Sequence, residues 1–448
     1  MLNEFKKTAK LSLPITLGMI GQGLFGLIDA LMIGQILGEL ALAAATLGIT
    51  VTILPIYCAI GFCIAIPVLS AQARGSNNAH ELPHILRHGL FVVLVFTIFC
   101  AIALAIFISH DGLHALGQPE DVIVEARDFS TILAWAVVPA GIFQAIKVFL
   151  DATSRPWVAL LWMTIGLVLN IFLNWVLMTG ALGFPNLGLA GAAWGTLFSR
   201  AISLVGMCLH GKLAFEWKAA ISRVHLRRNL AIGIPSAIQI LAEGGLFIAA
   251  PIAMGWLGAR ALAANQVAMN ISTLAYMIPL GVSQAASIRV GEAFGENNWQ
   301  KIKKISAGIL IFSGAFMAIY STVVISLRHK IPVFYNVEPE TAELAANVLV
   351  IVGTYSIFDG LQCASAGILR GLSDVRPVMW GSIICYWVIS APLALLLAFP
   401  LGFGGCGIWA GMAAGLASAA AIFLLSIAKN FRKARANFAT TTPKNIAR

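Results

Sequence analysis

The feature that most constrains this chain is a series of long apolar segments separated by short polar ones. A helix needs about 20 mainly apolar residues to cross the hydrocarbon layer of a membrane. Twelve segments meet this requirement, namely residues 11–37, 45–72, 89–110, 124–150, 157–180, 189–212, 230–257, 266–291, 305–327, 342–370, 378–400 and 405–430. The sequence therefore predicts an all-α membrane protein with twelve transmembrane helices.

The composition and the motifs exclude several other classes. Of the 448 residues, 59% are hydrophobic and 11% are charged, whereas a soluble domain has about 25% charged residues. The seven cysteines include no CxxC pair and mostly lie singly in apolar runs, so we interpret them as core residues. No Walker-type glycine-rich loop and no HExxH pattern is present. We therefore expect neither an enzyme nor a bound cofactor.

The positive charges predict an orientation in the membrane. The net charge is +10, which we attribute to basic cytoplasmic loops and not to nucleic-acid binding. With a cytoplasmic N-terminus, 24 of the 29 Lys and Arg residues, Lys147 among them, fall on the cytoplasmic side. The exceptions are Arg127, Arg260, Arg328 and Lys330 on the other side and Arg200 inside a span. We expect both termini in the cytoplasm and the chain in a bacterial inner membrane.

An internal repeat predicts how the twelve helices are grouped. Four sets of motifs recur in the same order at offsets of 216 to 221 residues, for example Arg155-Pro156 with Arg376-Pro377. Six spans per copy give both copies the same orientation, so the repeats are parallel. They form two six-helix bundles related by a pseudo-twofold axis along the membrane normal, with a cleft suited to alternating access. We predict lobes at residues 1–212 and 230–448 joined by a cytoplasmic linker loop at 213–229.

Four charged side chains lie well within the predicted spans: Asp29, Arg200, Glu243 and Asp359. A charge at the centre of a bilayer costs about 2.5 kcal/mol or more, so each should face a cavity or a partner. Three acids and one base indicate an interior that handles cations. The role of Arg200 stays open between a structural partner, a lipid headgroup contact and transport.

In the second half, Glu243 and Asp359 predict a cation site. Two nearby carboxylates in a medium of low dielectric constant do not both ionise readily without a cation between them. Tyr355 precedes Asp359 by one helical turn, so its hydroxyl can reach the carboxylate or a bound ion. Gln266 and Asn270 are also one turn apart and are candidates to line the same site. These five residues predict a site that takes either Na⁺ or H⁺.

In the first half, Asp29 predicts a site for substrate or proton coupling. Asn170 and Asn174 are one turn apart in the fifth span and therefore share a helical face. Their amides can hydrogen-bond an acid from the first span of the same bundle. The alternative is that both amides only pack helices together.

Three histidines, His80, His84 and His88, have a spacing that can bind a metal ion on a helix. Pro83 and the loop position favour a solvated amphipathic segment instead. We therefore predict no metal site there.

Together these features resemble the multidrug and toxic compound extrusion (MATE) family of transporters, in its bacterial NorM-like form. The resemblance extends over roughly residues 8–430. The segments that carry it are Gly26-Leu-Ile-Asp29, Ile234-Pro235 with Glu243, Tyr276-Met-Ile-Pro279, Arg289-Val-Gly291, Phe358-Asp359, Leu369-Arg370-Gly371 and the two Arg-Pro pairs.

The resemblance implies export of cationic amphipathic compounds by antiport with Na⁺ or H⁺, by a protein that acts as a monomer. It places the cation site on Glu243, Tyr355 and Asp359, and the first-half acid on Asp29 with Asn170 and Asn174 beside it. Some relatives carry an acid at the position of Asn174, so the amide here leaves Asp29 as the sole acid of that lobe. The alternative is a flippase or exporter of a lipid-linked or other endogenous substrate. A cationic groove would favour it, whereas the deep charges here are mainly acidic.

Overall fold

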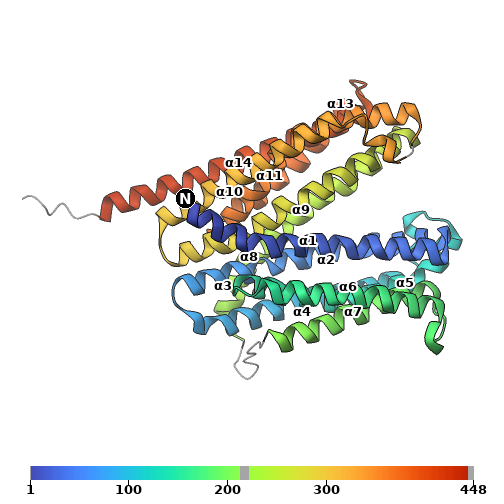
Figure 1. Cartoon of the computed structure of the whole chain (residues 1–448), viewed down its shortest axis with the longest axis horizontal. Coiled ribbons are helices and arrows are strands. Elements are labelled where there is room, and N and C mark those ends of the chain that lie inside the picture. Colours follow the sequence, from blue (N-terminus) through green and yellow to red (C-terminus); the bar gives the residue numbers. More distant parts are fainter. Residues whose placement is uncertain (1, 212–220, 336, 442–448) are drawn as a thin grey trace, which may run out of the picture. The chain divides into compact units, whose positions relative to one another are not determined.

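The computed structural model describes residues 2–211, 221–335 and 337–441. This part of the chain is almost entirely helical and contains no strand, and twelve of its helical segments are long and apolar enough to span a membrane. The predicted all-α membrane protein with twelve spans is confirmed (Figure 1). The α-helices are α1 (Leu2–Leu37), α2 (Glu39–Cys63), α3 (Ala65–Gly75), α4 (Leu82–Ser109), α5 (Glu120–Ala152), α6 (Pro156–Thr179), α7 (Gly188–His210), α8 (Arg223–Trp256), α9 (Ala259–Gly295), α10 (Trp299–Ser326), α11 (Pro339–Gly371), α12 (Arg376–Ser382), α13 (Ala391–Ala398) and α14 (Gly404–Thr441).

Short helices complete the chain. A π-helix, η5 (Ile383–Ser390), joins α12 and α13 into one span. The 3₁₀-helices are η1 (Ala79–Glu81), η2 (His114–Leu116), η3 (Ala181–Gly183) and η4 (Pro332–Tyr335).

The internal repeat is visible in the backbone. A left-handed φ angle is adopted most easily by glycine and asparagine, and it marks a sharp turn between helices. They recur in pairs at nearly the same offset in the two halves, at Gly38 and Gly258, Asn77 and Asn297, Ser154 and Ser373, and Gly188 and Gly404. The two halves of the chain thus turn at matching positions, as expected for a duplicated six-helix unit.

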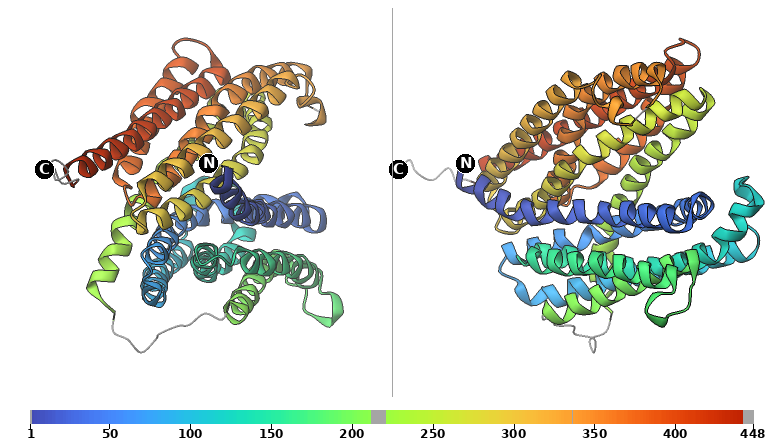
Figure 2. Two further views of the ribbon diagram at one scale, coloured as in Figure 1. Left: turned by 60° about the vertical axis from the view of Figure 1, so that its left-hand side comes forward. Right: turned by 45° about the vertical axis from the view of Figure 1, so that its right-hand side comes forward.

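The helices pack as two compact units. Unit 1 consists of Met1–Thr16, Arg74–Asn77 and Ile238–Arg448, and unit 2 of Leu17–Ala73 and Asn78–Ala237. In unit 1, α9, α10 and α14 pack against α11, and in unit 2, α2, α4 and α7 pack against α5 (Figure 2).

The predicted lobes, residues 1–212 and 230–448, are defined by the internal sequence repeat. The two units are defined by which residues contact one another in the structure. The lobe boundaries therefore stay a prediction. Of the predicted linker loop at 213–229, residues 213–220 lie outside the described residues, and residues 223–229 form the first turns of α8.

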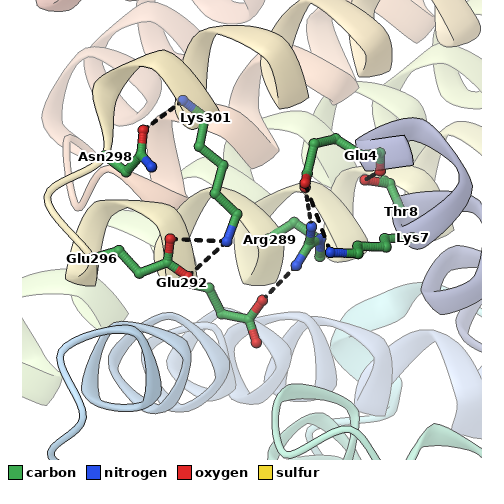
Figure 3. A network of polar contacts seen from close by, with 8 residues as sticks. All are labelled: Glu4, Lys7, Thr8, Arg289, Glu292, Glu296, Asn298 and Lys301. Carbon is green, nitrogen blue, oxygen red and sulfur yellow. Dashed lines mark hydrogen bonds and ion pairs between the residues drawn. The ribbon is translucent and has the colours of Figure 1, made fainter. Parts of the chain in front are cut away.

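An ionic cluster in unit 1 joins the start of α1 to α9 (Figure 3). Arg289 of α9 donates hydrogen bonds to Glu4 at 2.5 Å and to Glu292 at 2.8 Å. Arg74, at the end of α3, lies 3.4 Å from Glu292. Asn298 caps the start of α10 by accepting a hydrogen bond from the backbone N–H of Lys301. These contacts explain why two short segments from early in the chain belong to unit 1.

A buried ion pair lies in unit 2. Lys147 Nζ and Asp151 Oδ2, one turn apart on α5, are 3.2 Å apart, and each side chain is only 2% exposed. Lys147 also reaches the face of α1 at Gly18. Lys147 was counted among the positive charges of the cytoplasmic side, which stays a prediction, whereas its enclosure in the helix bundle with Asp151 was not predicted.

The histidine segment is also less solvated than predicted. His88 is 1% exposed, and its Nε2 accepts a hydrogen bond of 2.9 Å from the backbone N–H of Ser222. Its Nδ1 lies 2.7 Å from the carbonyl oxygen of His84, so this nitrogen donates and the ring is neutral. The rings of His84 and His88 both contact His225 of α8. The helical start of α8 covers these rings, which a reading of residues 79–88 alone does not reveal.

Gly367 allows α9 and α11 to approach closely, and the helices that carry the candidate site depend on this contact. A Cβ atom at Gly367 would lie 2.3 Å from the carbonyl oxygen of Ser283. We expect Gly367→Ala to lower the free energy of unfolding by about 1–3 kcal/mol through overpacking. Gly23→Ala is the control, because nothing lies within 4 Å of that position. Thermal unfolding of both variants in detergent tests this expectation. An unfolding midpoint of Gly367→Ala equal to that of Gly23→Ala would contradict it.

Candidate functional site

In unit 1, Glu243 lies in a cage of hydrogen-bond donors. Tyr276 of α9 donates to Glu243 Oε1 at 3.0 Å, and Gln239, one turn earlier on α8, donates to Oε2 at 3.1 Å. Gln362 of α11 adds a further side-chain hydrogen bond. Arg370 donates in turn to Gln239 Oε1 at 2.5 Å. Hydrogen bonds to a carboxylate stabilise its negative charge, so they offset part of the cost of enclosing Glu243 in the helix bundle.

Asp359 has the opposite surroundings. It is 4% exposed, and its Oδ1 is buried without a hydrogen-bond partner. Its charge and that of Glu243 repel each other. A buried carboxylate without a donor is costly unless it holds a proton or lies beside a cation. Asp359 is therefore the acid of this pair that has a free oxygen to offer an ion.

The other three residues predicted for this site, Tyr355, Gln266 and Asn270, have hydrogen-bond partners other than the two acids. Tyr355 lies one turn before Asp359 as expected, but its hydroxyl pairs with the hydroxyl of Ser272 and its ring stacks on Trp409. Gln266 and Asn270 hydrogen-bond each other at 3.1 Å, and Gln266 is exposed. The structure thus places Asp359 within electrostatic range of both Glu243 and Tyr355, and it places Gln266 and Asn270 in a pair of their own.

The π-helix η5 adds a further side chain to this environment. Tyr386 is fully buried, and its hydroxyl has no hydrogen-bond partner. It interacts electrostatically with both Glu243 and Asp359. The wider winding of a π-helix is frequent at functional sites because it redirects a side chain. Gln362 Oε1 is likewise buried without a partner.

In unit 2, Asp29 of α1 is held by two helices. Asn174 of α6 donates to Asp29 Oδ1 at 2.6 Å, and Thr196 of α7 donates to Oδ2 at 3.3 Å. Asn170 donates to Thr196 Oγ1 at 3.2 Å and so supports the second of these bonds. The predicted association of Asp29, Asn170 and Asn174 is therefore present in the structure.

Arg200 lies one turn after Thr196 on α7, and its charge attracts that of Asp29. It also lines a cavity of about 220 Å³ inside unit 2. Arg200 is therefore a neighbour of the Asp29 network, and a headgroup contact is not needed to explain it.

Several residues of these sites were missed by the sequence analysis. Gln239, Tyr276, Gln362 and Tyr386 are uncharged, and polar residues of this kind are common in membrane helices. The spacing of Gln239 and Glu243, one turn apart, was a usable signal. The sequence gave no such signal for Thr196, because the hydroxyl of a threonine in a helix commonly hydrogen-bonds a backbone carbonyl of the same helix.

The arrangement defines a multi-pass membrane protein with buried or partly buried acids inside each of its two units, a feature that suits a secondary transporter. The MatE family model matches residues 14–176 and 235–396, which is well over half of the chain. The chain belongs to the MATE family of membrane transporters, and this confirms the resemblance seen in the sequence.

Relatives and solved structures agree with this assignment. A probable multidrug resistance protein NorM of Rhizobium meliloti is 34% identical over 439 residues, covering 93% of this chain and 91% of the relative. The multidrug resistance protein NorM of Burkholderia vietnamiensis is 33% identical, covering 93% and 92%. A crystal structure of MATE in the bent conformation superposes with a TM-score of 0.89 at 19% identity, covering 97% of both chains. The eukaryotic MATE transporter AtDTX14 gives 0.85 at 23% identity, covering 97% and 99%. These structures support the fold.

Proposed function

We propose that this protein is a secondary active multidrug exporter that moves cationic amphipathic compounds out of the cell in antiport with Na⁺ or H⁺. The names of the NorM relatives support the multidrug part of this proposal. The observation that carries the ion-coupled part is the buried, unpartnered oxygen of Asp359 beside the caged carboxylate of Glu243.

The buried oxygen atoms near Asp359 in unit 1 suit a small hard cation or a proton as their ligand. Carboxylate, amide and hydroxyl oxygens are the ligands that such cations prefer. Asp359 Oδ1, Gln362 Oε1 and the Tyr386 hydroxyl are buried oxygens without partners among the described residues, and Tyr355 interacts electrostatically with Asp359. A bound Na⁺ or H⁺ would neutralise Asp359 and remove its repulsion with Glu243.

The carboxylate of Asp29 in unit 2 suits a proton or a positively charged transported compound. Asp29 already receives hydrogen bonds on both carboxylate oxygens. In a medium of low dielectric constant, an unneutralised Asp29 attracts a cationic compound, and protonation of Asp29 removes that attraction. Ion and cargo then bias one conformational equilibrium in opposite directions, which is the requirement for antiport.

We place the protein in a bacterial inner membrane, with both termini in the cytoplasm and the monomer as the working unit. The excess of Lys and Arg on the side of the termini supports this orientation.

Transport into liposomes tests the proposal. The purified protein is reconstituted, and uptake of a fluorescent cationic compound is followed under Na⁺ and H⁺ gradients imposed separately. We expect at least one gradient to drive uptake above the level of empty liposomes, and we expect Asp29→Asn to reduce it. Glu125→Gln, an exposed acid on α5, is the control.

Failure of both gradients to drive uptake would contradict antiport. A cell-envelope defect in a deletion strain without any change in drug susceptibility would favour the flippase alternative.

A further inference from the structure

The last helix of unit 1, α14, changes from apolar to basic along one exposed face. Leu425 is 69% exposed and Ala428 is exposed as well. The next exposed residues on the helix are Lys429, Arg432 and Lys433. Residues three or four apart share one side of a helix, so Leu425, Lys429 and Lys433 form a continuous line. Over about two turns, this face passes from a hydrophobic surface to a positively charged one.

This change falls where the surface of the membrane is expected. The segment Gly404–Ala434 is long and apolar enough to span a membrane, and Lys429 is its first charged residue. The uncharged residues 404–428 satisfy the requirement of about 20 residues for crossing the hydrocarbon layer. Lys429 and its basic neighbours therefore lie at the level of the lipid headgroups, with Leu425 on the side of the acyl chains.

The three basic side chains have no counter-ion in the part of the protein that the structure describes. Lys429, Arg432 and Lys433 form no ion pair with a described residue. No Asp or Glu follows Asp374 in the sequence, and Asp374 accepts a hydrogen bond of 2.7 Å from Asn430. Consecutive helical residues are rotated by about 100°, so Asn430 and its acid lie to the side of Lys429. Three uncompensated positive charges are therefore presented together.

The opposite side of α14 is packed against the rest of unit 1. The ring of Phe431 meets that of Trp299 of α10 edge to face, with 6.3 Å between the ring centroids. Ile427 and Ala434 are buried on the same side of the helix as Phe431. Phe431 is rotated by about 200° from Lys429, so the basic face points away from unit 1. This face is thus held in place from behind and open in front.

We propose that this face binds an anionic phospholipid, with the phosphate of the headgroup at Lys429, Arg432 and Lys433 and an acyl chain along Leu425. Ammonium and guanidinium groups form charge-assisted hydrogen bonds with phosphate oxygens. Basic clusters directly beyond a membrane span attract anionic lipids. A free phosphate shares the chemistry of the headgroup, but it has no apolar part to cover Leu425. The inference concerns the lipid around the protein and goes beyond the proposed export function.

A general excess of positive charge at one membrane surface would give a different result. Such an excess orients the chain through the number of basic residues, whatever helix face they occupy. Lys303 and Lys304, near the start of α10, are exposed and form no ion pair with a described residue. The nearby acid Glu296 lies 2.7 Å from Lys301 and supplies negative charge to that segment. This pair of lysines is therefore a matched control for the face of α14.

The test measures lipid binding to the purified full-length protein. Native mass spectrometry in a neutral detergent follows titrations with dioleoyl phosphatidylglycerol and dioleoyl phosphatidylcholine, which have the same acyl chains and differ in net charge. We expect the tightest site of the wild type to bind phosphatidylglycerol about 10- to 100-fold more tightly than phosphatidylcholine, because each basic residue at the surface contributes to the attraction. Soluble glycerol phosphate should not displace the lipid.

Variants place the site on α14. Lys429→Gln combined with Lys433→Gln should weaken the binding of phosphatidylglycerol about 10- to 30-fold and leave that of phosphatidylcholine unchanged. The control, Lys303→Gln combined with Lys304→Gln, removes the same charge and should change the affinity by no more than about twofold. Leu425→Gln removes the apolar contact and should weaken both lipids.

Equal affinity of the wild type for the two lipids would overturn the proposal. So would an equal loss of affinity for phosphatidylglycerol in the two double variants, since that result indicates a diffuse effect of charge. Displacement of the lipid by glycerol phosphate would assign the basic face to a free phosphate instead. If the double variant on α14 does not fold, Arg432→Gln takes its place, and wild-type affinity in that variant would contradict the site.

Discussion

Replacing Asp359 by Asn is expected to abolish ion-driven export while the protein stays folded. The change keeps the size of the side chain and removes an acidic oxygen that is buried without a donor among the described residues. Because an amide carries no negative charge and takes up no proton at physiological pH, the site can no longer alternate between a charged and a neutralised state in each cycle. We expect uptake driven by either gradient to fall to the level of empty liposomes. We expect the free energy of unfolding to stay equal or to rise, by about 1 kcal/mol at most, since a buried charge is lost.

The matched control is Glu343→Gln on the same helix. Glu343 is exposed near the start of α11, so its replacement should leave both transport and stability unchanged. If Asp359→Asn retained wild-type transport under both gradients, the site in unit 1 would not be the coupling site. If it transported the compound without any gradient, Asp359 would be a gate and not an ion ligand.

The largest effect on stability is expected at the buried pair of Lys147 and Asp151. Replacing Lys147 by Met leaves the carboxylate of Asp151 without its partner, 3.2 Å away, in a position that is 2% exposed. Breaking a buried ion pair by removing one partner costs about 3–5 kcal/mol. We therefore expect a much lower unfolding temperature in detergent and a reduced yield of folded protein.

A second replacement distinguishes the pair from simple packing. Adding Asp151→Leu to Lys147→Met removes both charges, so most of the lost stability should return. Breaking the exposed pair of Arg260 and Glu340 with Arg260→Met is the control, and it should change the unfolding free energy by no more than about 1 kcal/mol. Additive losses in the double variant would mean that the two charges do not stabilise each other.

The fold was predictable from the sequence because the membrane imposes a simple length requirement. Each span is an apolar run long enough to cross the hydrocarbon layer, and all twelve are found. The deep acids were predictable for the same reason, since a carboxylate in an apolar run needs a special environment. Asp29, Glu243 and Asp359 were therefore singled out correctly as buried or partly buried polar positions.

The partners of these acids were harder to predict. Tyr276, Gln362 and Thr196 reach them from other helices, and which faces meet depends on rotation and packing that helical spacing does not specify. Lys147 is a further example, because its place near the end of an apolar run gave only a side of the membrane and no partner. Its partner Asp151 lies one turn further on α5, and the pair is enclosed by neighbouring helices.

The π-helix Ile383–Ser390 gives the eleventh span a mechanical property that the other spans lack among the described residues. Successive residues of an α-helix are rotated by about 100° around its axis. If the extra residue of a wide turn migrates along the helix, the stretch that it passes swivels by about that angle while both ends stay in place. The side chain of Tyr386 would then rotate away from Glu243 and Asp359 while the span stays helical. The span would in this way rotate part of its length without moving its ends, beside the two carboxyl groups where we propose that an ion binds.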